Sequence, residues 1–396
     1  MIAGTEDIAA AVMALFPDRP RLLALGEPTH GEETLLEVRN ELFEQLVERE
    51  GYRTIALETD CVMGLVVDDY VTSGTGTLDE VMERGFSHGW GASAANRDLV
   101  RWMRAFNAAY DDDRLRFAGF DGPLEITAAA SPRPVLTALH GYLAARADPE
   151  LLPCTAGELD RLLGADDRWT NPAVMRDPSQ SVGQTPAARE LRLLADDLVA
   201  LLDAQTPQLI AASTPDEWDR ARMYGRTATG LLRYHRWMAD TSPARLTGLV
   251  SVRDSMMAAN LISLTEHSAA LVHANNGHLQ RDKSTMRMGG QLLAWWSAGA
   301  IAGAHLGDGY AFLATALGTI RHHGVDTPPP DTIEGRLYAL PEDRQVVDPR
   351  RLAAAFGDAP PAPRVSPWFG YAPLDPSHMA NYDGIVFVKD TPPDVR

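Results

Sequence analysis

Apolar residues in the first 125 positions follow two alternating spacings. Segments with apolar residues on one helical face alternate with short continuous apolar runs, which are typical of buried strands. We predict helices over residues 6–15, 33–50 and 95–110, and strands over residues 21–25, 54–57 and 115–120. Helices that alternate with short strands indicate a parallel sheet covered on both faces. The predicted fold class is therefore α/β, with a mainly parallel central sheet flanked by helices.

The middle of the chain has a different pattern, because strand-like runs are scarce between residues 126 and 245. Amphipathic helical segments dominate there, over residues 135–145, 185–204 and 214–239, while 165–183 is typical of a surface loop. The last helix starts at Thr214-Pro215-Asp216-Glu217, which combines a capping threonine with a proline and a glutamate. We interpret this part as a large helical insertion that forms one wall, or a lid, of an active-site cleft.

The α/β pattern resumes at about residue 246. We predict helices over residues 251–267 and 290–297, and strands over residues 269–273 and 382–389. Residues 301–305 and 311–316 are either two strands or a strand and a helix, and the Pro- and Asp-rich stretch 327–364 is predicted to be irregular. The chain thus divides into a first part of the α/β core (1–125), the helical insertion (126–245) and a second part of the core (246–396).

Acidic, imidazole and amide side chains follow four of the predicted strands. In open α/β sheets the ligand crevice lies beyond the carboxyl ends of the strands. We therefore expect these side chains, although far apart in the sequence, to meet at one site. The residues at the four strand ends are Glu27 and His30, then Glu58, then Asp121, then His273, Asn275 and His278.

One arginine lies on an apolar helical face, since Arg39 shares that face with Leu35 and Leu46. A buried charge requires a partner, and the neighbouring strand ends offer Glu27 and Glu58. The alternative is that the long side chain extends along the face to reach water. The periodicity alone leaves both arrangements open.

A second arginine repeats this pattern, because Arg253 and Asn260 share one face of the helix that precedes His278. An inward arginine and an inward amide would suit an oxygen-rich substrate. His30 follows Glu27 by three residues, and a nearby carboxylate both raises the basicity of a histidine and fixes its tautomer. This pair is a candidate general base with its orienting group.

Charge and cysteine content exclude several classes of protein. The formal net charge is −18, which disfavours binding to nucleic acid. Only Cys61 and Cys154 are present, so the chain has neither a disulfide framework nor a paired cysteine metal motif. No stretch approaches the ~18–20 apolar residues that span a bilayer, and the N-terminus lacks the basic start of a signal peptide. We expect a cytoplasmic, monomeric protein that acts on a small molecule, away from membranes.

Several catalytic motifs are absent from the sequence. It has no phosphate-binding Gly-x-x-x-x-Gly-Lys-Ser/Thr loop, no Gly-x-Gly-x-x-Gly after the first strand and no Gly-x-Ser-x-Gly nucleophile turn. A nucleotide enzyme and a serine-nucleophile hydrolase are therefore disfavoured. Histidines and glutamates at the strand ends could ligate a metal, but the His-Glu-x-x-His helix motif is missing. We predict that the protein uses no metal and no other cofactor.

Six short motifs occur in an order that resembles the erythromycin esterase family. They are Leu25-Gly26-Glu27-Pro28-Thr29-His30-Gly31, Arg39, Ala56-Leu57-Glu58, Gly119-Phe120-Asp121, Val252-Arg253-Asp254 and Asn276-Gly277-His278. The resemblance implies hydrolysis of an ester, typically a macrolide lactone as in antibiotic resistance, without a covalent serine intermediate. It also implies that His30 acts as the base on water, with Glu27, Glu58 and Arg39 around it and His278 across the site. We expect the substrate to contact Asp121, Asn260, Arg253, His273 and Asn275.

The chain departs from the family pattern at one position, because Asn275 replaces the first of two histidines around the Asn-Gly pair. His273 precedes it by two residues, so in a strand both side chains project to the same side, and His273 is a possible replacement. Two other hypotheses remain open. The protein could be an acyl-transfer or amide-forming or amide-cleaving tailoring enzyme of natural-product biosynthesis, or a catalytically silent protein that binds a small molecule.

Overall fold

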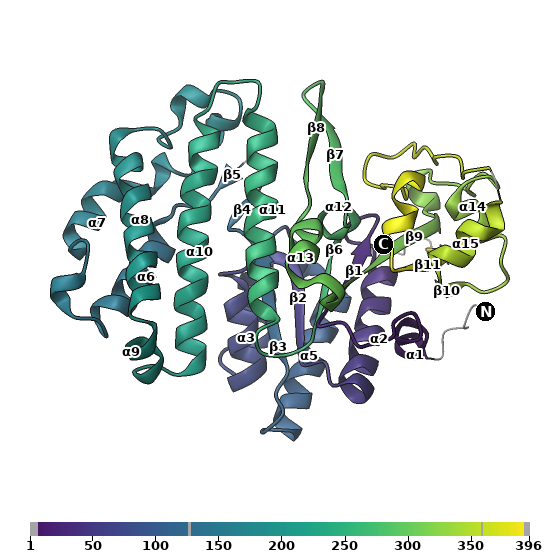
Figure 1. Ribbon diagram of the computed structural model, residues 1–396, viewed down its shortest axis with the longest axis horizontal. Coiled ribbons are helices and arrows are strands. Elements are labelled where there is room, and N and C mark those ends of the chain that lie inside the picture. Colours follow the sequence, from purple (N-terminus) through teal and green to yellow (C-terminus); the bar gives the residue numbers. More distant parts are fainter. Residues whose placement is uncertain (1–6, 126–127, 358, 392–396) are drawn as a thin grey trace.

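The computed structural model describes residues 7–125, 128–357 and 359–391. Within these ranges seven strands form one sheet in the order β10-β11-β9-β1-β6-β2-β3 (Figure 1). Every neighbouring pair is parallel except β10 and β11. The predicted α/β fold with a mainly parallel sheet is therefore confirmed. The strands are β1 (Leu22–Glu27), β2 (Thr54–Asp60), β3 (Arg116–Asp121), β6 (Ala270–Asn275), β9 (Tyr310–Thr319), β10 (Arg344–Val347) and β11 (Gly384–Asp390).

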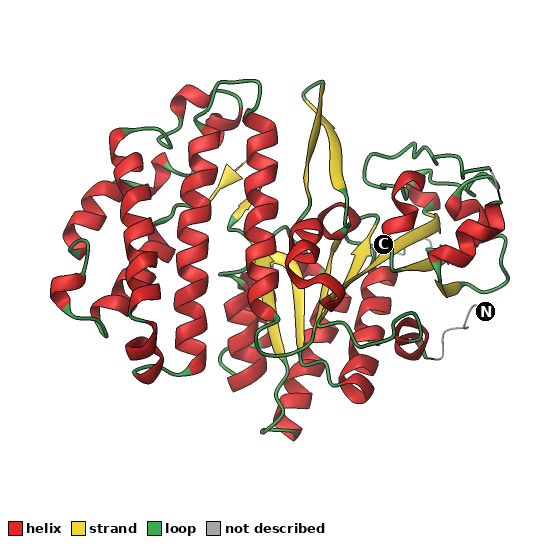
Figure 2. Ribbon diagram, in the orientation of Figure 1, coloured by secondary structure: helices red, strands yellow, loops and turns green. Residues whose placement is uncertain are grey.

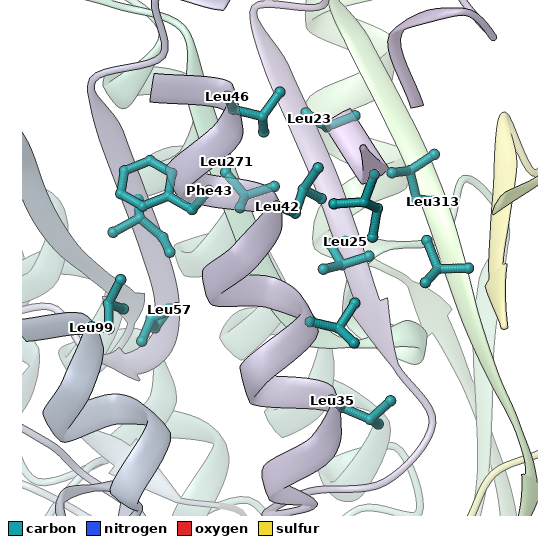
Figure 3. Close-up of a cluster of buried hydrophobic side chains, with 14 of the residues drawn as sticks. Leu23, Leu25, Leu35, Leu42, Phe43, Leu46, Leu57, Leu99, Leu271 and Leu313 are labelled. Atoms are coloured by element: carbon teal, nitrogen blue, oxygen red, sulfur yellow. The ribbon is translucent and has the colours of Figure 1, made fainter. Parts of the chain in front are cut away.

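Helices cover both faces of this sheet (Figure 2). Leu23 and Leu25 of β1 pack against α2, together with leucines of the neighbouring strands (Figure 3). Leu22 and Ala24 project to the opposite face. Because each strand buries both sets of side chains, it is apolar almost throughout. The first face carries α1 (Ile8–Met13), α2 (Glu33–Glu50), α3 (Gly64–Ser73), α4 (Leu78–Arg84) and α5 (Ala94–Ala109), and the second α11 (Arg245–Leu264), α13 (Ala298–Leu306), α14 (Ile333–Tyr338) and α15 (Pro349–Phe356).

A group of helices with its own apolar cluster lies beside α11, at one end of the molecule (Figure 1). The predicted helices over 135–145, 185–204 and 214–239 correspond to α6, α8 and α10. Thr214 and Glu217 form the expected capping box at the start of α10. The segment 165–183 consists of short turns but buries Trp169 and Val174. The helices are α6 (Arg133–Ala144), α7 (Ala156–Leu163), α8 (Pro186–Ala204), α9 (Thr206–Ala211) and α10 (Pro215–Met238), and β4 (Leu124–Glu125) pairs with β5 (Ala128–Ala129) beside them.

The helix predicted over 290–297 is wrong, because this segment is the strand β8 (Gln291–Trp296). It pairs with β7 (Lys283–Met288) in an antiparallel hairpin that stands clear of the main sheet (Figure 1). Gly289 and Gly290 form the turn with φ angles of 57° and 80°. Two-residue hairpin turns require φ > 0 at both positions, which glycine adopts without strain. Leu293 and Trp295 bury one face of the hairpin near α11.

The segment 327–364 is also more regular than predicted, since it contains α14, β10 and α15. Asp348 caps α15 and Pro349 occupies its first turn, so the residues that indicated irregular structure in fact start a helix. Of the two segments left open, 301–305 lies in α13 and 311–316 lies in β9. The predicted N-terminal helix is α1, and Glu6, its predicted first residue, lies outside the described residues. None of the described helices is long and apolar enough to cross a membrane.

A side chain separates β1 from β9 at the carboxyl end of the sheet. Their pairing ends at Leu25, and beyond it Asn276 donates to the carbonyl of Thr315 (2.8 Å) and accepts from its N–H (3.1 Å). A Cβ atom at position 26 would lie 2.0 Å from Oδ1 of Asn276. Gly26 is therefore required for this close approach. The sheet opens where β1, β6, β2 and β3 end side by side.

Candidate active site

Glu27, the last residue of β1, binds two imidazoles. Its Oε1 lies 2.6 Å from Nδ1 of His30, and its Oε2 lies 3.2 Å from Nε2 of His273. Burial raises the pKa of Glu27, but the charge and hydrogen bond of His273 and those of His30 outweigh it, so the pKa falls to about 2. Glu27 is therefore an ionised carboxylate that holds both rings.

His30 presents its other nitrogen to solvent, since Nδ1 faces Glu27 and its side chain is 44 % exposed. Burial lowers the pKa of His30, whereas the hydrogen bond with Glu27 and the charges of Glu58 and Glu27 raise it to about 9. The resting ring thus carries a proton at neutral pH. Trp90 packs beside it, with the ring centroids 5.2 Å apart.

Arg253 of α11 joins the carboxylates that end β2 and β3. Its Nη2 donates to Oε1 of Glu58 (3.1 Å) and to Oδ2 of Asp121 (2.7 Å). Burial raises the pKa of Asp121, but Arg253 and His88 lower it to about 2. Burial likewise raises the pKa of Glu58, while His278, His30 and Arg253 lower it below its usual value. Both acids are therefore ionised, and one guanidinium fixes their positions.

A further imidazole lies just beyond the end of β6, in the short helix α12 (Asn276–Leu279). Nδ1 of His278 lies 2.8 Å from Oδ1 of Asp254, and its Nε2 lies 3.5 Å from Glu58. Asp254 has no exposed surface and accepts from Nε1 of Trp295 (2.9 Å) and from N of Ala298 (3.1 Å). Burial lowers the pKa of His278, but Asp254 and Glu58 raise it. Buried carboxylates therefore orient three imidazoles of the site: Glu27 binds His30 and His273, and Asp254 binds His278.

The structure places most of the predicted site residues together. Glu27, His30, Glu58, Asp121, Arg253, His273 and His278 surround the ends of β1, β6, β2 and β3. Asn275 joins this cluster through its backbone N–H, which donates to Glu58 (2.9 Å), whereas its side chain accepts from N of Gly277 and caps α12. Its amide oxygen is therefore occupied within the protein.

Arg39 is buried, at 1 % exposure, so it does not reach water, and within the described residues it does not form the ion pair of the other arrangement left open either. Its Nη2 donates to Oδ1 of the neighbouring Asn40 (2.7 Å), and no carboxylate of the described residues lies within 4.0 Å of its guanidinium. It lines the same cavity of about 20 Å³ as Glu27 and Glu58. Burial lowers the pKa of Arg39 to about 10, while Glu27 raises it. The charge of Glu27 therefore reaches Arg39 through space, without direct contact between the two side chains.

Asn260 lies outside the cluster, contrary to the prediction that it contacts the same substrate. Its amide nitrogen donates to the carbonyl of Phe120 (3.1 Å), and its Oδ1 accepts from Nε of Arg226 (3.2 Å). The side chain thus connects α11 to β3 and α10. Arg253 and Asn260 do share one inward face of α11, as predicted. Along this face, however, Arg253 reaches the cluster, whereas Asn260 contacts β3 and α10.

Sequence reasoning missed His88 and Trp90. Nε2 of His88 lies 3.3 Å from Asp121, and its Nδ1 lies 3.1 Å from Glu125. Nε1 of Trp90 donates to the carbonyl of Glu58 (3.0 Å). His88 has φ +57°, and among the described non-glycine residues it alone has a positive φ. Its neighbour Gly89 is the one sequence signal for this turn, because the segment follows a helix rather than a strand.

The cluster can bind a polar group and transfer protons through two imidazoles. Cys61, the nearest thiol in the sequence to Glu58, is buried, and burial raises the pKa of its thiol to about 12, so it is not a thiolate nucleophile. Among the described residues, no three or more His, Cys, Asp or Glu side chains are arranged to hold a metal ion. The geometry thus supplies acid–base groups and a fixed positive charge.

Comparison with known proteins gives fold neighbours of low sequence identity. A protein from Bacillus cereus superposes with a TM-score of 0.71 at 18 % identity, covering 97 % of this chain and 90 % of the other. A succinoglycan biosynthesis protein gives 0.69 at 15 %, covering 98 % and 90 %. A mutant of the erythromycin esterase EreC in its open conformation gives 0.65 at 17 %, covering 95 % and 93 %. These likenesses establish a shared fold.

The sequence also matches the erythromycin esterase family over residues 47–391. The matched range includes Glu58, Asp121, Arg253 and His278, while Glu27, His30 and Arg39 precede it. Membership supports a hydrolase of that family. Because the match covers most of the chain, the protein belongs to the erythromycin esterase family.

Proposed function

We propose that the protein hydrolyses an ester or lactone of a natural-product-type small molecule, with water as the nucleophile and no covalent serine intermediate. The observation that carries the proposal is the pair of imidazoles, His30 and His278, that buried carboxylates orient at the ends of neighbouring strands. Family membership supports the same reaction class. His30 is the proposed base, because it is the more exposed of the two rings.

In the proposed reaction, His30 acts in its deprotonated form: its Nε2 takes a proton from water while the water oxygen bonds to the carbonyl carbon. The tetrahedral alkoxide that forms is stabilised by the Nε2–H of protonated His278, whose Nδ1–H donates to Asp254. The ester C–O bond then breaks, and the leaving oxygen takes the proton from His30. A carboxylic acid and an alcohol are released, and His30 returns to its neutral form.

The test is hydrolysis of an ester and lactone panel that includes macrolide lactones, which enter because EreC is an erythromycin esterase. His30→Ala should lower the rate on any hydrolysed ester by about 10²–10⁴-fold, the usual share of a general base, while the circular dichroism spectrum stays that of the folded protein. His322→Ala is the matched control, since this exposed histidine lies outside the site. Wild-type turnover by His30→Ala would overturn the assignment.

Acyl transfer is the second candidate, and Asn275 favours it. The side chain at this position is occupied in capping α12, so the site lacks the imidazole that the family pattern places there. The reaction should be run in ¹⁸O-labelled water with an alcohol or amine present. Label in the acid product indicates hydrolysis, whereas an acylated alcohol or amine indicates transfer. Tight binding with no product from any ester would favour a silent binding protein.

A further inference from the structure

A cavity of about 600 Å³ lies between β3, α3, α10 and α11. This volume is in the ~300–1,000 Å³ range of small-molecule pockets. The cavity reaches the amino ends of the strands, where Arg53, Arg116 and Ser268 line it. The catalytic cluster lies at the carboxyl ends of the same strands, so the two sites are separate. Asn260, which does not contact the catalytic cluster, lines this cavity.

Six arginines line the cavity, and five of them bind carboxylates. The pairs are Arg53 with Asp113, Arg114 with Asp111, Arg116 with Asp68 and Asp216, Arg220 with Asp69, and Arg222 with Glu266. Asp219, the remaining lining carboxylate, binds His267. These carboxylates are therefore already paired.

Arg226 is the sixth arginine, and its interactions are with neutral groups. Nε donates to Oδ1 of Asn260 (3.2 Å) and Nη2 donates to Oγ of Ser263 (2.9 Å). Among the described residues, no carboxylate lies within 4.0 Å of this guanidinium, and no hydrogen bond involves its Nη1. Burial lowers the pKa of Arg226 to about 10, and the charge of Arg222 adds to this. The charges of Glu266 and Asp219 act on Arg226 from a distance, but within the part of the chain that the structure describes its guanidinium has no carboxylate in direct contact and its Nη1 is left free to donate.

The rest of the lining mixes hydroxyl and amide groups with an apolar part made of Leu65, Phe117, Ala118, Met223 and Leu264. We propose that this cavity binds a small organic anion, a carboxylate or a phosphate monoester on a short apolar chain. The anion accepts hydrogen bonds from Nη1 of Arg226, and the chain lies against the apolar side chains. This site is independent of the proposed ester hydrolysis.

The experiment is isothermal titration of the full-length protein with hexanoate, hexyl phosphate and the neutral hexanamide. At least one anion should bind with one-to-one stoichiometry, and hexanamide should bind at least about tenfold more weakly. Tighter binding of hexanoate identifies a carboxylate site, and tighter binding of hexyl phosphate identifies a phosphate site. The proposal is overturned if neither anion binds at millimolar concentration or if hexanamide binds equally well.

Arg226→Gln should weaken anion binding by about tenfold or more. Arg233→Gln is the matched control, because it removes the same charge from α10 but does not line this cavity. His30→Ala is a second control, because a carboxylate could also bind at the catalytic cluster as a product of ester hydrolysis. Both controls should bind within about twofold of the wild type. Loss of binding in either control with retention in Arg226→Gln would overturn the proposal.

A second variant keeps the proposal testable if Arg226→Gln fails to fold. Ala118 is half-buried on β3 and lines the cavity, so Ala118→Leu fills part of the apolar space while retaining the guanidinium. It should lose anion binding by about tenfold or more. Circular dichroism and the melting temperature report whether each variant is folded. If a folded Ala118→Leu variant binds the anions with unchanged affinity, the apolar chain of the ligand does not lie in this part of the cavity, and the proposal is overturned.

Discussion

Nδ1 of His278 lies 2.8 Å from Oδ1 of Asp254, a carboxylate with no exposed surface. The partner of Asp254 on its other side is Nε1 of Trp295, which belongs to the β7–β8 hairpin. The orientation of one imidazole of the site therefore depends on a hairpin that stands outside the main sheet. A residue of this hairpin can influence catalysis without contacting the substrate.

The first prediction concerns this arrangement. Asp254→Asn should lower kcat on a hydrolysed ester by about 10²–10⁴-fold, because the amide can no longer fix the tautomer of His278 or stabilise its charged form. Trp295→Phe, which removes one hydrogen bond but keeps the carboxylate, should cost about tenfold or less. Both are measured by steady-state kinetics. Equal and small losses in the two variants would show that His278 needs no orienting charge.

The second prediction concerns pH. The pKa of His30 is raised to about 9, so a base at this position loses its proton only as the pH approaches 9. The value of kcat/KM should therefore rise about tenfold per pH unit below pH 9 and level off above it. Glu27→Gln should shift the midpoint to lower pH, because the ring loses its carboxylate partner. If activity instead falls above pH 9, His30 acts as the acid.

The third prediction compares two buried arginines. Arg253→Met should cost about 3–5 kcal/mol of unfolding free energy, because Asp121 and Glu58 remain buried without their partner. Arg39→Met should change stability by about 1 kcal/mol or less, because no carboxylate is left unpaired. Urea unfolding measures both. Similar losses in the two variants would show that Arg39 has a charged partner in solution.

The fourth prediction concerns acid stability. The pKa of Glu27 falls from 4.5 to about 2 and that of Asp121 from 3.8 to about 2 on folding. A carboxyl group with a lowered pKa stabilises the fold above its unfolded value, and this stability is lost as the pH falls through the folded value. The unfolding free energy should therefore decrease from about pH 4.5 to pH 2. Glu27→Gln should flatten this decrease, and the exposed Glu83→Gln should not.

The fifth prediction concerns metals. Each Nδ1 of His30 and His278 already binds a carboxylate, and no group of three or more metal-ligating side chains is arranged as a metal site in residues 7–125, 128–357 and 359–391. Purified protein should contain substoichiometric zinc and manganese, and activity should survive treatment with a chelator. Loss of activity that zinc or manganese restores would contradict this.

Much of the site was predictable from the sequence because parallel strands place their carboxyl ends together. Glu27, Glu58 and Asp121 each follow an apolar run, so their positions followed from the strand pattern alone. Helical periodicity placed Arg39 on the apolar face but left open whether its side chain is buried, as the structure has it. The hydrogen-bond partner of Arg39 could not be predicted in this way. It is the next residue, Asn40, and periodicity carries no information on contacts between the side chains of adjacent residues.

Other features depend on contacts that a local pattern does not contain. His88 reaches Asp121 only because its backbone adopts a positive φ, and the helix before it gave no strand end to mark the turn. A helix was predicted for the second strand of the hairpin around Gly289, because over so short a segment its apolar residues fit the helical period as well as the strand period. The two glycines were the stronger signal, since they permit the tight turn.

The contact between Gly26 and Asn276 has a genetic consequence. A side chain at position 26 would occupy the space that the Asn276 amide uses to reach Thr315, so the two positions share one volume. Gly26→Ala alone forces them to compete, whereas a smaller residue at 276 would relieve the clash. The fitness effect of a substitution at either position is thus conditional on the other. Two positions far apart in the sequence are therefore expected to be epistatic, because their side chains would share one volume in the fold.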